Sequence, residues 1–182
     1  MKKVTGEKKK EPIKWIVLEK RADKVLLISR YALDYKKYNK KDKDITWKDC
    51  TLRKWLNDEF IETTFDKNEQ KHVAETILKN KGNRKIYGGG DTLDKIFLLS
   101  IDEAEKYFSS DDARKCEPTK YAKAQYVHLG DNGCCWWLRS PGDYRNGAGA
   151  ARVFSDGSVG TSGYSVNNVF NAIRPAIWVN IE

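Results

Sequence analysis

Cysteine is the residue type in this chain with the greatest capacity for chemistry, and four cysteines are present. Cys134 and Cys135 are adjacent, whereas zinc sites and thioredoxin-type redox sites separate their paired cysteines by two or more residues. Cys50 and Cys116 are each isolated in the sequence. We therefore expect four buried thiols that pack as small hydrophobic side chains, and we name no metal ligand and no cofactor.

Other patterns that serve catalysis in enzymes are incomplete here. His72 and His128 lie in no motif that pairs a histidine with a nucleophile. The glycine run at 88–90 lacks the Gly-Lys-Ser/Thr sequence of a phosphate-binding loop, so it is interpreted as a flexible loop. Asp102 and Glu103 lie at the start of a predicted helix, where the helix dipole favours carboxylates without catalysis. No catalytic residue is predicted.

The positive charge of the chain belongs to its N-terminal half. Residues 1–90 hold 24 Lys and Arg against 14 Asp and Glu, whereas residues 91–182 hold 10 against 12. Lysines alternate with acidic residues through 36–48, as they do on a solvated surface, so nucleic acid is not the expected partner. Nucleic-acid binding stays open as an alternative, and it predicts an affinity that falls steeply with salt.

The length of 182 residues indicates one domain. Lys8, Lys9 and Lys10 predict a flexible basic arm over residues 1–11, which leaves residues 12–182 for the folded domain. No apolar run approaches the roughly 18 residues of a membrane span. Lysines, rather than the apolar segment of a signal peptide, follow the first residue. The chain as given is therefore expected in the cytoplasm, with the cell surface or a phage particle as alternatives.

Hydrophobic patterning predicts a mixed α+β domain with mostly short strands. Residues 15–18 and 25–29 are apolar runs on either side of a polar turn, which predicts a hairpin. Further strands are predicted at 96–100 and 173–181, and Pro141-Gly142 predicts a turn. Strands and helices do not alternate, so a doubly wound parallel fold is not expected.

Helices are predicted between these strands. Leu52, Trp55, Leu56 and Phe60 recur at helical spacing after Asp49, which we interpret as the N-cap. Another helix is expected at 67–78, and short ones at 111–115 and 119–124. A capping box of Ser100 and Glu103 predicts a helix that continues through Phe108.

Large side chains near the predicted strands are interpreted as structural. Arg139 and Arg174 each precede a proline by one or two residues, and we expect them to bond backbone carbonyls at the two ends of a Gly-rich segment. Tryptophan is usually buried with its N–H bonded, so four tryptophans are expected to anchor the core: Trp15, Trp55, Trp136 and Trp178.

The Gly-rich segment has an unusual composition. Lys, Glu, Gln, Met and Trp make up 45 of the 182 residues, yet none of the five occurs from Gly142 to Ile177, a stretch of 36 residues. Gly, Ser, Asn, Ala and Val fill the segment instead, with scattered Asp, Tyr, Phe and Arg. Two interpretations stay open: a plain loop region of a structural domain, or a surface whose composition has been set by its function.

Motifs along the chain resemble a known family. The series WIVL, LLISRYALD, ITW, LRKWLNDEF, DKIFLLS, EAEKYF, WWLRSPG and RPAIW, over residues 12–182, is similar to a bacterial family known only as a domain of unknown function. The resemblance implies a C-type-lectin-like fold related to formylglycine-generating enzymes, with short twisted antiparallel sheets, a few helices and long Gly/Ser/Asn-rich loops. The usual first strand has no match in the charged residues 4–10, so the N-terminal edge is expected to be shortened.

The activities of these related folds do not carry over to matching residues. Calcium-dependent lectins need an acidic or amide residue before the proline that corresponds to Pro175, and this chain has Arg174 there. Formylglycine-generating enzymes need a spaced cysteine pair, which Cys134 and Cys135 do not form. An oxidase that uses one of these two cysteines stays as an alternative function.

The resemblance also extends to the variable proteins of diversity-generating retroelements. In that system randomised AAC codons encode fifteen amino acids but never Lys, Glu, Gln, Met or Trp, the five that are missing from 142–177. An unvaried skeleton can be picked out at Ala151, Val153, Asp156, Gly157, Val159, Gly163 and Val166. The residues between them, at 143–146 and 152–171, are the expected diversified positions.

These observations predict a non-catalytic ligand-binding module with its binding face in residues 143–171. Its partner would be a protein or a cell-surface ligand, and a structural domain without a ligand is the remaining alternative. Tyr and Phe supply rigid contact area while Ser, Gly and Asn supply adaptable hydrogen bonds, as in antibody loops. The predicted ligand contacts are Tyr144, Arg145, Asn146, Arg152, Phe154, Ser158, Thr161, Ser162, Tyr164, Asn167, Asn168, Phe170 and Asn171.

Overall fold

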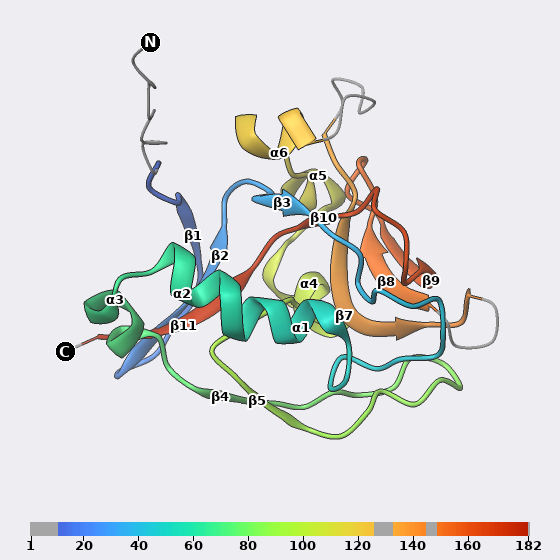
Figure 1. Cartoon of the computed structure of the whole chain (residues 1–182), viewed down its shortest axis with the longest axis horizontal. Coiled ribbons are helices and arrows are strands. Elements are labelled where there is room, and N and C mark those ends of the chain that lie inside the picture. Colours follow the sequence, from blue (N-terminus) through green and yellow to red (C-terminus); the bar gives the residue numbers. More distant parts are fainter. Residues whose placement is uncertain (1–10, 126–132, 145–148, 182) are drawn as a thin grey trace, which may run out of the picture.

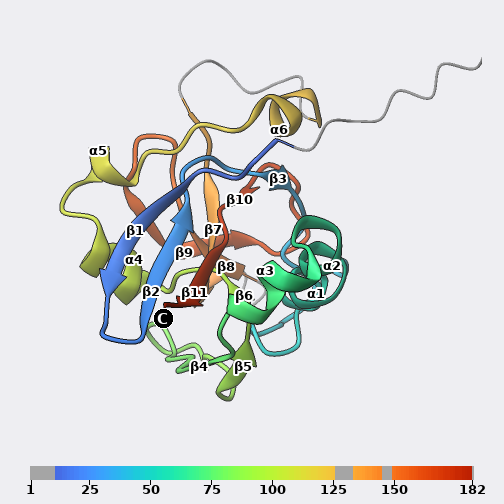
Figure 2. The same cartoon turned by 90° about the vertical axis from the view of Figure 1, so that its left-hand side faces the viewer.

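The first hairpin forms where a polar turn separates two apolar runs, as predicted. In the computed structural model, which describes residues 11–125, 133–144 and 149–181, strands β1 (Trp15–Lys20) and β2 (Lys24–Ser29) pair antiparallel. Strand β11 (Ala176–Asn180) pairs with β2, and β6 (Ile96–Phe97) pairs with β11 at the edge of the sheet. The strand order is β1-β2-β11-β6. Residues near the two ends of the described chain therefore lie side by side (Figures 1 and 2).

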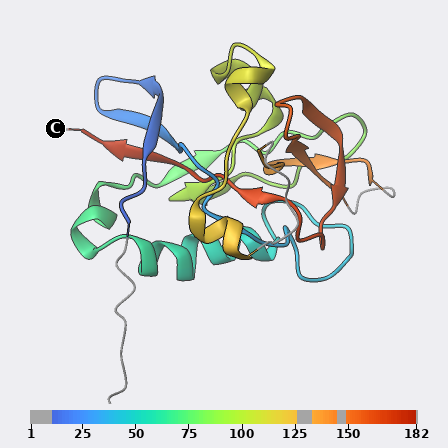
Figure 3. The ribbon, with the colours of Figure 1, turned by 90° about the horizontal axis from the view of Figure 1, so that it is seen from above.

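A second sheet carries the Gly-rich segment. Its order is β3-β10-β7-β8-β9, and all neighbours are antiparallel except β10 and β7. Seen from above, this sheet lies at the opposite end of the molecule from the first hairpin (Figure 3). The strands are β3 (Asp34–Tyr35), β7 (Trp136–Gly142), β8 (Gly149–Val153), β9 (Val159–Ser165) and β10 (Ala172–Ile173).

Two strand predictions at the C-terminal end are corrected. The strand expected at 173–181 divides at Arg174-Pro175, so that β10 belongs to the second sheet and β11 to the first. Proline cannot donate to a strand ladder, which favours a change of partners at this point. Pro141 and Gly142 form the end of β7 rather than a turn, because Gly142 packs directly on Gly163 of β9: a Cβ at Gly142 would lie 2.4 Å from the Gly163 Cα.

A continuous helical segment runs across the front of Figure 1, made of α1 (Thr51–Trp55), the π-helical η1 (Leu56–Phe60) and α2 (Ile61–Thr64). Its N-cap is Cys50, not Asp49, because the Cys50 thiol accepts the Arg53 N–H. The next helix, α3 (Lys67–His72), is shorter than predicted. Val73 forms a bridge to Val179, and strand β4 (Thr76–Leu78) begins where the helix at 67–78 was expected to continue.

The other helices follow the predictions. Helix α4 (Ile101–Tyr107) has the expected capping box, in which Ser100 and Glu103 each accept a backbone N–H from the other residue. Short helices α5 (Asp111–Arg114) and α6 (Lys120–Gln125) lie at the other two predicted places. Strand β5 (Thr92–Asp94) pairs with β4 as a separate two-stranded sheet. The chain is thus a mixed α+β domain of short, mainly antiparallel sheets with few helices.

Tryptophans fill the core. Trp136 and Trp178 are buried as expected, Trp15 and Trp55 only partly so, and the fully buried Trp47 and Trp137 belong to the core although they were not predicted as anchors. The predicted basic arm at 1–11 lies outside the described residues except for Glu11. Among the described helices none is long and apolar enough to span a membrane.

Candidate functional site

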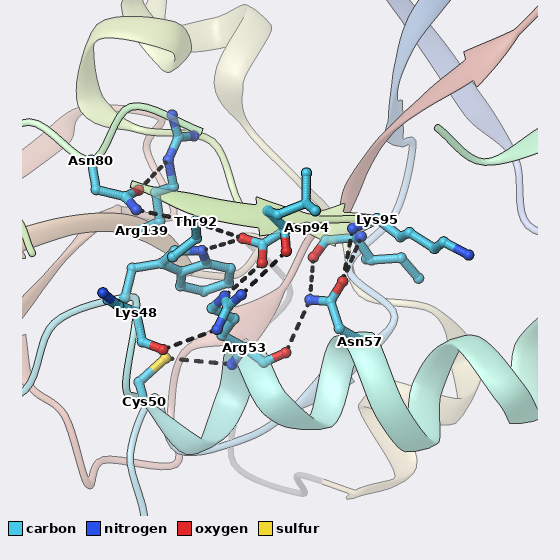
Figure 4. Close-up of polar contacts among 12 residues, drawn as sticks. Lys48, Cys50, Arg53, Asn57, Asn80, Thr92, Asp94, Lys95 and Arg139 are labelled. Carbon is cyan, nitrogen blue, oxygen red and sulfur yellow. Dashed lines mark hydrogen bonds and ion pairs between the residues drawn. The ribbon is translucent and has the colours of Figure 1, made fainter. Parts of the chain in front are cut away.

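Arg53 and Asn57 of the LRKWLNDEF motif, which sequence reasoning did not single out, belong to a network of buried and partly buried polar contacts (Figure 4). The Asp94 carboxylate, whose side chain is fully buried, accepts hydrogen bonds from Trp47 Nε1 at 2.8 Å, Arg53 Nε at 2.6 Å and Thr92 Oγ1 at 2.9 Å. A carboxylate with three donors around it is occupied on both oxygens. We find here an internal ion pair that joins the helical segment to β5.

The other polar groups of Arg53 and Asn57 are also used within the chain. Arg53 donates from Nη1 to the Lys48 carbonyl at 3.0 Å and from Nη2 to the Leu93 carbonyl at 3.3 Å. Asn57 donates to the Ile96 carbonyl at 2.9 Å and accepts the Lys95 N–H at 2.8 Å. These bonds tie helix to strand and engage the polar side-chain groups of Arg53 and Asn57 within the chain.

Arg139 and Arg174 act as the predicted brackets. Arg139 donates to the Leu98 carbonyl at 2.9 Å and also forms a bidentate ion pair with Glu103, whose nearer bond joins Nη1 and Oε2. Arg174 donates to the carbonyls of Ser29 at 3.0 Å and Arg114 at 3.2 Å. Burial lowers the pKa of Arg174. Both arginines hold backbone segments together on either side of the Gly-rich region.

The glycine run at 88–90 is packed against neighbouring segments, in contrast to the flexible loop that was expected. A Cβ on Gly88 would lie 2.2 Å from the Asn80 carbonyl oxygen, and Gly89 has a φ of 88° against Thr46. Asn80 donates to the Gly90 carbonyl at 3.0 Å. The glycines are therefore required for close backbone packing.

The cysteines are free thiols, and three of the four are buried as predicted. Cys134 donates from Sγ to the Cys116 carbonyl at 3.2 Å. Hydrogen bonding with Cys116 and burial raise the pKa of Cys134, and burial raises the pKa of Cys50 to about 12. Cys135 is only partly buried. No described group of three or more Cys, His, Asp or Glu side chains is arranged to hold a metal ion.

The Gly-rich segment folds into the hairpin of β8 and β9 and the chain that follows it to β10. The proposed skeleton provides its interior: Ala151, Val153 and Val166 have no solvent exposure. Gly157, with a φ of 90°, lies so close to α5 that a Cβ would come within 1.8 Å of the Asp111 carbonyl oxygen. Gly163 has a φ of 77° where β9 crosses β7.

The predicted contact residues are mostly more exposed to solvent than the buried skeleton residues. Ser162 and Phe170 are exposed, and Asn171 is the one fully buried member among those described. Arg145 and Asn146 lie outside the described residues. The members that are partly buried are Tyr144, Arg152, Phe154, Ser158, Thr161, Tyr164, Asn167 and Asn168.

Five of these residues, Arg152 among them, form one cluster, in which three side chains contact the Arg152 guanidinium. Its central carbon lies 4.0 Å from the Tyr164 ring centroid and 4.6 Å from that of Phe154. The Tyr144 and Tyr164 ring centroids are 5.8 Å apart. Arg152 Nη1 donates to the Asn171 Oδ1 at 3.3 Å. We call these five residues the Arg152 cluster.

Two residues from a distant part of the chain border the hairpin, and sequence reasoning missed them. Asn83 donates from Nδ2 to the carbonyls of Pro141 at 2.9 Å and Thr161 at 2.6 Å. Arg84, which has a left-handed φ of 55°, donates to Thr161 Oγ1 at 3.2 Å and pairs with Asp143 at 2.8 Å. Their sequence, inside a glycine-bearing loop, carries no local signal for this contact.

Comparisons with known proteins give one result. A protein-family model described as "Domain of unknown function (DUF6273)" matches residues 22–181. No curated protein matches the chain, and no solved structure matches it.

Proposed function

The chain belongs to the DUF6273 family of domains of unknown function, and from this premise we propose that it is a non-catalytic ligand-binding module. The binding face is the surface of β8, β9 and the chain up to β10, within residues 143–171. A protein or a ligand on a cell surface is the partner that such a face fits.

The observation that carries this proposal is the division of the segment by burial. Of the seven skeleton positions, Ala151, Val153, Gly157 and Val166 are buried, and Gly163 has a backbone conformation that suits glycine. Val159 is partly buried, and Asp156 is exposed and does not follow the division. The described contact positions, Asn171 apart, all retain solvent exposure. A segment of this kind can vary its exposed residues without losing its fold, because the side chains that pack inside, Asn171 apart, are not the ones proposed to vary.

The chemistry of the exposed residues also suits recognition. Tyr144, Phe154 and Tyr164 offer rigid aromatic area, while Ser162 and Asn167 offer adaptable hydrogen-bonding groups. The charged groups of the motif networks are engaged within the chain, so the support beneath the face is held in place. Rigid support reduces the ordering cost of binding.

We further propose that the domain is C-type-lectin-like and that its face is diversified by a retroelement. Short antiparallel sheets with few helices support the first part. The absence of Lys, Glu, Gln, Met and Trp from 142–177 supports the second, because randomised AAC codons never produce these residues.

Comparison of the chromosomal DNA tests the diversification. A near-copy of the codons for residues 136–178, differing only at adenines and lying beside a reverse transcriptase gene, is expected downstream. If the neighbouring DNA holds no such copy, the retroelement part of the proposal is wrong and the face is a fixed one.

A formylglycine-type thiol oxidase is the rival function. Cys134 is only 1% exposed and its pKa is raised, so an oxidant and a peptide thiol reach it poorly without rearrangement. Mass spectrometry of a thiol peptide incubated with the protein and copper separates the two functions. The binding proposal expects an unchanged peptide, and conversion that Cys134→Ala or Cys135→Ala abolishes would establish the oxidase.

A further inference from the structure

Arg152 is partly buried and, like the buried Arg174 and the exposed Arg30, has no carboxylate partner among the described residues. Five arginines of the described chain form ion pairs with Asp or Glu: Arg21, Arg53, Arg84, Arg114 and Arg139. Arg152 forms none with any described residue and is held by aromatic rings and one long hydrogen bond to Asn171. A guanidinium is always charged, and it recognises planar acceptor pairs most strongly.

Two buried donors at this position have no acceptor. Arg152 Nε and Asn171 Nδ2 are both inaccessible to solvent and make no hydrogen bond within the described residues. The Asn171 Oδ1 accepts from Arg152 Nη1, which leaves the amide nitrogen as the free group of that side chain. Asn171 itself has no solvent exposure. Buried donors without partners are rare in folded proteins, and each one needs an explanation.

We infer that the Arg152 cluster is a subsite for a carboxylate group of the ligand. This inference rests on the proposed function, because the cluster lies at the centre of the proposed face. The carboxylate oxygens accept from the guanidinium of Arg152 and from Asn171 Nδ2, and so satisfy both unpartnered donors. Arg152 as a whole is partly exposed, so the ligand reaches its guanidinium from solvent. Nε and the Asn171 amide nitrogen are themselves covered, so binding requires both side chains to turn toward the ligand.

The surroundings favour a carboxylate over a phosphate. The rings of Phe154 and Tyr164 lie within 4.6 Å of the guanidinium carbon and keep water away from it, which strengthens a charge-assisted hydrogen bond. The guanidinium fork binds carboxylates and phosphates alike in a bidentate manner. A carboxylate has only two oxygens to satisfy, whereas a phosphate has further charged oxygens that need donors beyond this fork. No lysine occurs in the segment 142–177 to supply such a donor.

Nitrogen-detected or proton-detected NMR on the full chain tests the subsite with defined probes. Sodium acetate is titrated against sodium chloride of equal ionic strength, and inorganic phosphate is titrated separately. Acetate is expected to move the Arg152 Nε–H and Asn171 Nδ2–H signals together and saturably. Phosphate should bind at least ten-fold more weakly. Arg30, which forms no ion pair with a described residue and lies near Tyr31, is the internal control and should not saturate.

Two variants separate recognition from general loss of structure. Arg152→Lys keeps the positive charge but loses the planar pair of guanidinium donors. Its acetate affinity should fall at least ten-fold at an unchanged melting temperature. Asn171→Asp supplies an internal carboxylate, so acetate should no longer bind while Arg152 Nε–H shifts as it does with bound acetate.

Acetate that leaves both signals unmoved, or phosphate that binds as tightly as acetate, overturns the carboxylate assignment. Neither result bears on the DNA comparison that tests the face. A face that is diversified but does not bind acetate would leave the proposed function standing without this subsite.

Discussion

Two arginine-centred regions of the molecule differ in how completely their donors are used. Around Asp94, Arg53 directs Nε to a buried carboxylate and its two Nη groups to backbone carbonyls. In the Arg152 cluster the guanidinium lies against two aromatic rings, and Nε has no described acceptor. All three nitrogens of the Arg53 guanidinium group have acceptors within the chain. Arg152 Nε, in contrast, acquires an acceptor only when the proposed ligand binds.

This difference distinguishes residues that stabilise the fold from residues of the proposed binding face. Motif residues such as Arg53 and Arg139 are conspicuous in the sequence because they are charged, yet their charges hold the fold together. The less conspicuous Gly-rich segment carries the proposed ligand contacts, most of them on side chains that retain solvent exposure.

The Asp94 network gives the largest expected loss. Asp94→Asn leaves Arg53 and Trp47 with a neutral partner in a buried place, and removal of one member of a buried ion pair costs about 3–5 kcal/mol of unfolding free energy. Urea unfolding followed by tryptophan fluorescence measures it. Asp143→Asn, which breaks the exposed pair with Arg84, is the control and should cost about 1 kcal/mol or less. Equal losses for the two variants would contradict this distinction.

Two glycines of the hairpin provide a finer comparison. Gly157→Ala introduces a Cβ at a φ of 90° and against the Asp111 backbone, so roughly 2–3 kcal/mol of stability should be lost. Gly160→Ala meets only the movable Phe154 ring and should cost less. Thermal unfolding of both variants checks the order, and a Gly160→Ala loss as large as that of Gly157→Ala would refute it.

The contribution of Glu19 to the stability of the fold should depend on pH. Hydrogen bonds from Tyr107, Arg21 and Lys106 lower the pKa of Glu19 to about 2. A lowered carboxyl pKa stabilises the fold above the unfolded value near 4.5, and this contribution is lost as the pH falls toward 2. Because solvent screens this partly exposed group, the contribution is about 1 kcal/mol.

Glu19→Gln should therefore have a lower free energy of unfolding than the original protein at pH 7. This difference in unfolding free energy should become smaller as the pH falls from about 5 to about 2. Tyr107→Phe removes the strongest of the three hydrogen bonds and should show part of the same narrowing. Urea midpoints at several pH values measure the difference. A difference that stays constant with pH would mean that Glu19 contributes nothing through its charge.

Substitutions on the exposed face should have the smallest effect on folding. Ser162→Asn and Phe170→Ser change exposed side chains and should alter the unfolding free energy by about 0.5 kcal/mol or less. Calorimetry measures both variants. A loss comparable to that of Gly157→Ala would place these residues in the framework.

Much of the architecture was accessible from sequence where local signals decide it. The turn between β1 and β2, the Ser100 capping box and the short helices after Phe108 each depend on residues within a few positions of one another. The role of Arg139 and Arg174 was also predicted, since a charged residue in an apolar motif needs an internal partner.

The errors arose where distant contacts override local preference. Residues 73–78 left the helix because Val73 meets Val179, and Pro141-Gly142 stayed in a strand because Gly163 lies on top of it. Asn83 and Arg84 reach the hairpin from a loop almost sixty residues away from Asp143, which no spacing reveals. The convergence of Arg152, Tyr164 and Asn171 likewise depends on strand pairing rather than on sequence neighbours.

The division of framework and face is tested most directly by two displayed libraries that use the same fifteen amino acids. One library varies the face at Phe154, Ser158, Thr161, Ser162 and Phe170, and the other varies the skeleton at Ala151, Val153, Gly157, Gly163 and Val166. Protease resistance of the displayed chains measures the folded fraction. We predict that most face variants resist the protease and that few skeleton variants do. Equal resistance in the two libraries would contradict a stable framework that carries a variable binding face.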